Sequence, residues 1–193
     1  MKVSALVSAL LAVAAPAMAA PVAEPAASAP AAPKPFGIMS LRSASPIHFG
    51  QVSAAKGNYF LGLPKQNAVC EGKNPEAAVF YIQDSQLYLY TPKTKAVQKA
   101  YVDRSGMGQG KLGYISGNQS PPRNGELKGW KVDKNNYLTF NGSSLIACPK
   151  SIDNAWSIWV SAGVSQPGGN SGCLGFSSLT VPLDKPVKCS YTK

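Results

Sequence analysis

The sequence predicts an all-β domain of short antiparallel strands, and three observations support this fold class. The chain of 193 residues contains 18 glycines and 16 prolines, about 18 % of its length, against about 12 % in an average protein, which favours turns over long helices. Short segments alternate apolar and polar residues, and no amphipathic helix of eleven or more residues is visible after Pro35. Residues 59–82 and 137–160 share a spacing of apolar segments around a cysteine. A helical bundle is therefore not expected.

The N-terminal segment has the three parts of a secretory signal peptide. An apolar run over residues 3–15 follows Met1 and Lys2, and the small-x-small sequence at 17–19 comes next. Cleavage at the end of that sequence gives a signal peptide at 1–19. The apolar run is shorter than the roughly 20 residues that a membrane helix needs, so we expect a soluble mature chain without a membrane anchor.

The segment after the signal peptide differs in composition from the rest of the chain. Residues 20–35 are rich in alanine and proline and offer little to bury, so we predict a disordered tether, with a propeptide as the alternative. One all-β domain then occupies 36–193. Residues 187–193 lack the hydrophobic tail of a lipid-anchor signal, so attachment to a surface is expected to be non-covalent.

The strands are predicted from alternation and turn signals. Leucine and tyrosine alternate over residues 86–90, and residues 155–161 place Trp159 on the face opposite three apolar side chains. Turn-forming residues at 83–85 and 134–136 separate such segments. The pattern is that of half-buried antiparallel strands.

An internal repeat suggests how the strands are arranged. Residues 59–82 and 137–160 align without a gap, each with an apolar strand, a cysteine about ten residues later and a second apolar strand. A less exact copy runs over 101–132, which gives a period of about 40 residues. Threefold repetition predicts a β-trefoil-like barrel, and a β-sandwich is the alternative.

Four cysteines in an exported chain are expected to form two disulfides, for which three connectivities exist. We predict a Cys173–Cys189 bond because these residues enclose a short loop, and a Cys70–Cys148 bond by elimination. A metal site is not expected, because the sequence has no Cys-x-x-Cys spacing and a single histidine.

The composition leaves little room for catalysis or for a cofactor. The single histidine, His48, lies between apolar neighbours and is predicted to belong to the first strand, at the edge of the barrel. A glycoside hydrolase with paired carboxylates is the enzymatic alternative. Most candidate carboxylates adjoin turn residues, where they are expected to cap backbone N–H groups. These carboxylates are Asp84, Asp103, Glu126, Asp133, Asp153 and Asp184. We predict no catalytic residue, no metal and no cofactor.

Two Asn-x-Ser sequons, at Asn118 and Asn141, lie in turn-like surroundings and are predicted glycosylation sites. Asn141 is the better candidate, because Pro121 directly follows the sequon of Asn118.

Aromatic side chains form the candidate binding surface. Tyr81, Tyr88, Tyr90 and Trp159 lie opposite the aliphatic faces of their strands, and the repeat makes Tyr81 equivalent to Trp159. Such rings can stack on the apolar faces of sugars. The alternative is that a closed barrel or a second sheet buries these rings as core.

Positive charge adds to this candidate surface. Lys93 and Lys95 flank the strand pair that carries the tyrosines, and the whole chain has a formal net charge of +10. A basic surface attracts polyanions. Export makes nucleic acid a poor partner, so we expect cell-wall polysaccharide, including acidic or phosphorylated glycans.

Several strings of the sequence resemble the phiA-type family of fungal cell wall proteins. The most distinctive lie within 38–48 and 172–176, and others are at 59–62, 100–106, 137–142 and 147–149. The resemblance implies a small secreted wall protein linked to the development of phialides and conidia. Some members of the family are IgE-binding allergens. The resemblance implies no catalytic residue at any position of this chain.

We therefore expect a non-enzymatic, secreted protein of the fungal cell wall that contacts polysaccharide. A secreted effector or protease inhibitor acting through the loop 111–123 is the alternative, since loops vary freely on a rigid barrel. A glycoside hydrolase is the third interpretation.

Overall fold

The computed structural model describes residues 33–193. The predicted signal peptide at 1–19, and the predicted tether except for its last three residues, lie outside the described residues. The first strand begins at Phe36.

Alternating burial shapes the longer strands. β1 (Phe36–Leu41) and β7 (Gln98–Asp103) bury every second side chain and expose the others in part, as a strand with one face on the core must do. The other strands are β2 (Val52–Ala55), β3 (Asn58–Leu61), β4 (Val69–Cys70), β5 (Phe80–Gln83), β6 (Gln86–Leu89), β8 (Lys111–Ser116), β9 (Gly125–Glu126), β10 (Trp130–Val132), β11 (Leu138–Phe140), β12 (Leu145–Cys148), β13 (Trp156–Val160), β14 (Leu174–Pro182) and β15 (Cys189–Ser190).

Helical structure in the described part of the chain is limited to short 3₁₀ turns. Within residues 33–193 these are η1 (Ile152–Asn154) and η2 (Pro167–Gly169). In this described range, no helix is long and apolar enough to cross a bilayer.

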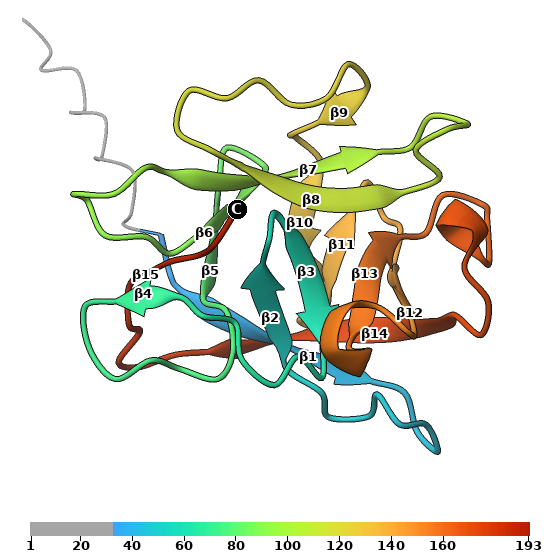
Figure 1. The fold of residues 1–193 in the computed structure, drawn as a ribbon, viewed down its shortest axis with the longest axis horizontal. Coiled ribbons are helices and arrows are strands. Elements are labelled where there is room, and N and C mark those ends of the chain that lie inside the picture. The colour runs from blue at the N-terminus through green and yellow to red at the C-terminus, as the bar shows by residue number, and fades with distance from the viewer. Residues whose placement is uncertain (1–32) are drawn as a thin grey trace, which may run out of the picture. The chain divides into compact units, whose positions relative to one another are not determined.

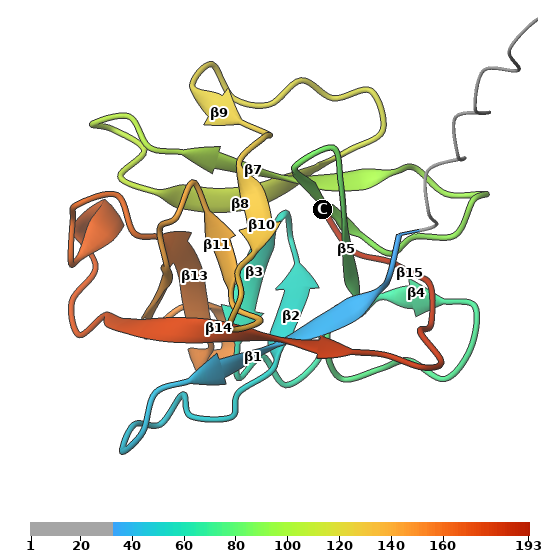
Figure 2. The same ribbon diagram turned by 180° about the vertical axis from the view of Figure 1, so that it is seen from behind.

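Nine antiparallel strands of the described chain close into a barrel (Figures 1 and 2). Their order around the barrel is β3-β8-β7-β6-β5-β1-β14-β12-β13, and pairing of β13 with β3 closes the ring. β2 extends the sheet beside β3, and β9 lies beside β7. The prediction of an all-β barrel is confirmed, and the sandwich alternative is not observed.

The β10–β11 hairpin contributes large rings to the core of the barrel. Lys128, just before β10, bridges to β6, and Tyr137, just before β11, bridges to β14. Trp130 and Phe140 of the hairpin are buried and meet edge-to-face with centroids 5.0 Å apart. Aliphatic side chains from the inner faces of the strands complete this core, so the barrel interior is packed with side chains.

The predicted repeat does not give equivalent positions in the barrel. Cys70 lies in β4, which pairs with β15 outside the barrel wall, whereas Cys148 lies in β12, which pairs with β13 and β14 within it. Similar spacing in the sequence therefore does not give the two segments similar partners in the structure.

All four cysteines form disulfides, but the predicted pairing was wrong. The bonds are Cys70–Cys189 and Cys148–Cys173, with sequence separations of 119 and 25 residues. Pairing of β4 with β15 sets Cys70 directly opposite Cys189, and the neighbouring strands β12 and β14 bring Cys148 close to Cys173. Strand pairing, rather than the shortest loop, decides which sulfurs meet.

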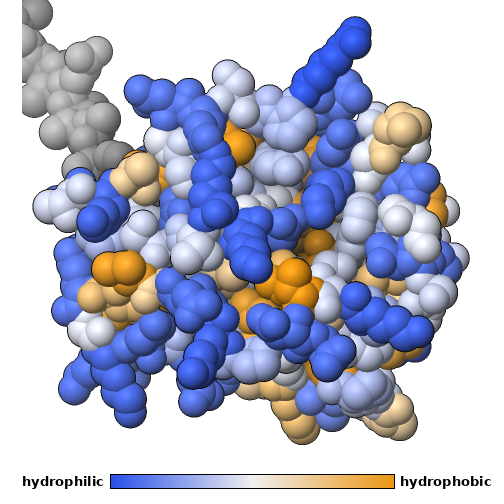
Figure 3. Space-filling view, viewed as in Figure 1, coloured by the Kyte–Doolittle hydropathy of each residue, from blue (hydrophilic) through white to orange (hydrophobic). Residues whose placement is uncertain are grey.

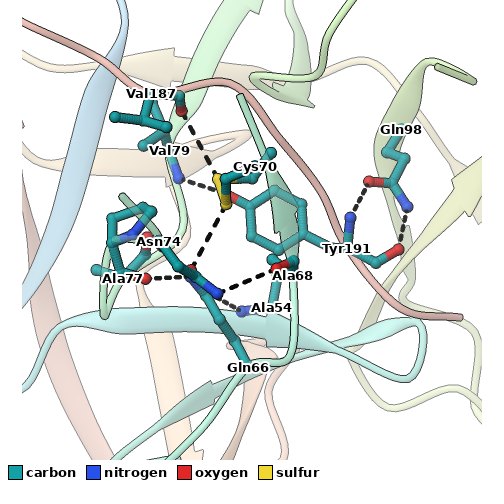
Figure 4. The surroundings of a disulfide bond; sticks show 12 residues. Ala54, Gln66, Ala68, Cys70, Asn74, Ala77, Val79, Gln98, Val187 and Tyr191 are labelled. Atoms are coloured by element: carbon teal, nitrogen blue, oxygen red, sulfur yellow. Dashed lines mark hydrogen bonds between the residues drawn. A yellow bond between two sulfur atoms is a disulfide. The ribbon is translucent and has the colours of Figure 1, made fainter. Parts of the chain in front are cut away.

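The Cys70–Cys189 disulfide lies beside a tightly held loop (Figure 4). The buried amide of Gln66 donates to the carbonyl oxygens of Pro75 and Ala77 at 2.7 and 3.2 Å. Hydrogen bonds from one buried side chain thus replace regular pairing in the connection between β4 and β5.

Candidate functional site

Three tyrosine rings lie against one another on the outer surface of β5 and β6. The two-residue period of β6 buries Leu87 and Leu89 and turns Tyr88 outward. Tyr88 faces Tyr81 of β5, and their rings stack with centroids 5.0 Å apart and an interplanar angle of 10°. The ring of Tyr90 meets Tyr81 edge-on at 6.2 Å. We call these three half-exposed residues the tyrosine strip.

The tyrosine strip lies outside the core because the barrel closes on the opposite face of these strands. Burial by its neighbours raises the pKa of Tyr81, and Tyr88 and Tyr90 raise it further. The pKa of Tyr88 is raised by burial and then by the charge of Asp84. The Tyr81 and Tyr88 rings are therefore uncharged at neutral pH, and the strip presents an aromatic surface with polar hydroxyl tips.

Lysines surround the tyrosine strip. The Nζ atom of Lys188 lies 5.7 Å from the centroid of the Tyr90 ring, and Lys99 of β7 lies opposite Tyr88 in the strand register. Lys93 and Lys95 are exposed in the loop that follows Tyr90. Sequence reasoning missed Lys188, because only the fold brings the C-terminal segment beside β6.

Trp159 is separate from the tyrosine strip, although the repeat made it equivalent to Tyr81. It lies on β13 and pairs there with Lys111 of β8, so that β6, β7 and β8 lie between this position and β5. Its indole N–H donates to Ser157 Oγ at 3.1 Å, and Lys111 Nζ lies 5.0 Å from its ring. A Cβ atom at Gly168 would lie 2.6 Å from the indole ring. Trp159 is thus covered along one edge.

Two of the candidate carboxylates cap turns, as predicted. Asp103 Oδ1 accepts a hydrogen bond from the N–H of Ser105 at 2.9 Å. Asp133 Oδ1 accepts from the N–H groups of Asn135 and Tyr137 at 2.8 and 2.9 Å. Such Asx turns occupy the carboxylate with backbone donors.

Glu126 has a different partner. It forms a bidentate ion pair with Arg104, with N–O distances of 2.8 and 2.7 Å. The hydrogen bond from Arg104 lowers the pKa of Glu126. The acid of a glycoside hydrolase requires the opposite, a raised pKa. This pair is therefore poorly suited to donate a proton to a leaving group.

The prediction that His48 belongs to the first strand was wrong. β1 ends at Leu41, and His48 lies in the following loop, where Ala44 and Phe49 have positive φ angles of 55° and 62° that no strand accommodates. The Nδ1 atom of His48 accepts the N–H of Arg42 at 3.1 Å. Among residues 33–193, no group of three or more His, Cys, Asp or Glu side chains is arranged to hold a metal ion.

The remaining predicted sites lie at the surface. Asn118 follows β8 and Asn141 follows β11, and both are exposed, so their glycosylation stays a prediction. The prediction that residues 111–123 form an inhibitory loop was wrong for the first half of this range. Residues 111–116 form β8 in the barrel wall, and only 117–123 are free of the wall to vary.

Comparison with known proteins adds to this geometry. Residues 36–192 match the sequence model of the PhiA-like secreted protein family. The chain belongs to the PhiA-like family. Its relatives include the protein named cell wall protein phiA of Emericella nidulans, which is 51 % identical over 161 residues, or 83 % of this chain and 87 % of the relative. No solved structure matches the chain.

Other PhiA-like relatives come from further fungi and carry the same name. The Aspergillus niger protein is 49 % identical over 159 residues, covering 82 % of this chain and 86 % of the relative. The Arthroderma benhamiae protein is 46 % identical over 145 residues, covering 72 % and 77 %. The expectation of a secreted protein located in the fungal cell wall is thereby confirmed.

Proposed function

We propose that this PhiA-like protein is non-enzymatic and associates with cell-wall polysaccharide through the tyrosine strip. The stacked pair of Tyr81 and Tyr88 is the observation that carries the proposal, since two nearly parallel, half-exposed rings lie together on the outer surface of the barrel. The C–H faces of a pyranose chain pack on such rings, and we expect each contact to contribute about as much as a pair of aromatic side chains, about 0.5–1.5 kcal/mol.

Several weak contacts along a polymer suit a wall protein. Tyr90 extends the strip edge-on, and Lys99 and Lys188 add hydrogen-bond donors beside the rings. Single contacts of this size bind a sugar weakly. A long polysaccharide offers many identical units, so repeated engagement raises the retention well above that of one contact.

A non-enzymatic role is supported by how the acidic side chains are used. Asp103 and Asp133 cap turns, and Glu126 is held ionised by Arg104. The one histidine of the chain accepts a backbone hydrogen bond. We also propose, from the resemblance to phiA-type proteins, that wall association serves the development of phialides and conidia.

The proposal is tested by mixing purified protein with isolated wall glucan, chitin and mannan at low and high salt. We expect retention on at least one neutral fraction that survives high salt, because ring stacking is not screened as exposed charges are. Release of soluble sugars from the same fractions would replace this proposal with a glycoside hydrolase. Absence of retention on every fraction would reject it.

A further inference from the structure

A groove runs over the outer surface of the barrel at β3, β7 and β8, and its lining shares no residue with the tyrosine strip. It has a volume of about 560 Å³. Its lining combines aromatic and proline rings with lysines, and these residues are Tyr101, Pro121, Pro122, Lys56, Lys111 and Lys193. Figures 1 and 3 look onto the face that carries the C-terminus and β8, where hydrophilic side chains predominate.

The strand register builds the floor of this groove. The alternation of β7 turns Tyr101 outward, and Tyr101 lies opposite Gly113 of β8. A Cβ atom at Gly113 would lie 2.8 Å from the Tyr101 hydroxyl oxygen. Glycine at 113 therefore lets the phenol ring lie across the surface of β8. Pro121 and Pro122, in the loop after β8, line the groove beside it.

The charge of the groove is uncompensated by acidic side chains. No aspartate or glutamate is among the lining residues, which all lie in the described range. The ion pairs within residues 33–193 are Arg104–Glu126 and Lys188–Glu71, so Lys56 and Lys111 belong to neither.

Lys111 gives the clearest evidence of a positive charge that has no acidic partner. Its nearest acidic neighbour in the register is Asp103, whose carboxylate accepts a hydrogen bond from the Ser105 N–H. Lys111 Nζ instead lies over the Trp159 ring. Burial lowers the pKa of Lys111, which means that its charge lacks part of the solvation it would have in water. A bound anion would replace this missing solvation of the ammonium group.

We propose that this groove binds a saccharide that carries an anionic group. The sugar ring packs on Tyr101 and the two prolines, and the anion is held by the lysines of the lining, Lys56 and Lys111. The proposal goes beyond the tyrosine strip, because both the site and the ligand class differ. A phosphate ester and a uronate carboxylate share the required chemistry, and both are tested separately.

The probes are mannose 6-phosphate, a galacturonic acid oligomer and a neutral mannose oligomer, each titrated calorimetrically into the full chain. We expect at least one acidic probe to bind more tightly than the neutral one. The variant Lys56→Gln/Lys111→Gln should weaken that binding about tenfold, as expected for the loss of charge-assisted hydrogen bonds. Binding of the phosphate alone or the uronate alone identifies the source of the anion.

The matched control is Lys131→Gln/Lys134→Gln, which removes the same charge from exposed positions near β10. An equal loss in this control would overturn the proposal, because it would reveal attraction to net charge only. Equal affinity of the acidic and neutral probes would also overturn it. Lys56 is exposed, so Lys56→Gln alone keeps the test valid if the double variant fails to fold.

Failure of this proposal is distinguishable from failure of the proposed function. The variant Tyr88→Ala should leave binding of the acidic probe unchanged, whereas Lys56→Gln/Lys111→Gln should leave high-salt retention on neutral wall polysaccharide unchanged. Loss of both activities in both variants would contradict the assignment of two separate sites.

Discussion

The side-chain amide of Gln98 is hydrogen-bonded to both backbone groups of Tyr191. Its Nε2 donates to the Tyr191 carbonyl oxygen and its Oε1 accepts the Tyr191 N–H, both at 2.9 Å (Figure 4). Gln98 is only 2 % exposed. The amide thus takes the place of a neighbouring strand and holds the chain just after β15 against β7.

Replacing Gln98 should therefore destabilise the barrel. Gln98→Leu keeps the approximate volume but leaves two buried backbone groups of Tyr191 without partners, at a cost of about 1–3 kcal/mol each. Urea denaturation should give a free energy of unfolding lower by at least about 2 kcal/mol. Gln83→Leu, at the exposed end of β5, is the control and should change it by less than about 0.5 kcal/mol. Equal effects of the two variants would contradict this role.

Alkaline pH should destabilise the fold. Burial raises the pKa of Tyr191 to about 12, and the pKa values of Tyr59 and Tyr114 are also raised, chiefly by burial. These phenols stay protonated in the folded chain while those of the unfolded chain ionise near pH 10. Their contribution to the free energy of unfolding is fully present below pH 10 and is lost as the pH rises through about 12. Unfolding free energies measured across this range should fall.

The variant Tyr59→Phe tests the contribution of the Tyr59 hydroxyl to stability separately from those of the other two buried tyrosines. The Tyr59 hydroxyl is buried and forms no hydrogen bond with any of residues 33–193, so phenylalanine removes a desolvated polar atom without breaking a contact. We expect unchanged or slightly higher stability at neutral pH, by up to about 1 kcal/mol, and a shallower loss at alkaline pH. A clear decrease in thermal stability at neutral pH would show that this hydroxyl has a partner.

The two disulfides should contribute unequally. Cys70–Cys189 closes a loop of 119 residues and Cys148–Cys173 one of 25. The chain-entropy relation gives about 5 kcal/mol for the first and about 3.5 kcal/mol for the second. Alanine replacement of each pair, followed by urea denaturation, checks this order. Non-reducing peptide mapping checks the pairing itself, and recovery of a Cys173–Cys189 peptide would contradict the structure.

Local pattern predicted much of this molecule, and non-local pairing explains what it missed. Alternation in β6 correctly turned Tyr88 away from the core, because side-chain direction in a strand depends only on the residue's parity. The partner of Cys70 could not be found this way, since β4 meets β15 across most of the chain. For the same reason, the sequence did not predict that Lys188 lies beside the tyrosine strip. His48 was misplaced because apolar neighbours resemble a strand, while positive φ angles nearby require a loop.

The most direct test of the account is retention of tyrosine-strip variants on insoluble wall polysaccharide at high salt. Tyr81→Ala/Tyr88→Ala removes the stacked pair from the barrel's outer surface. Phe49→Ala removes a ring that is 63 % exposed, in the loop between β1 and β2. We expect about tenfold weaker retention for the double variant and wild-type retention for Phe49→Ala. Wild-type retention of a folded double variant would contradict the central claim that the tyrosine strip holds the protein in the wall.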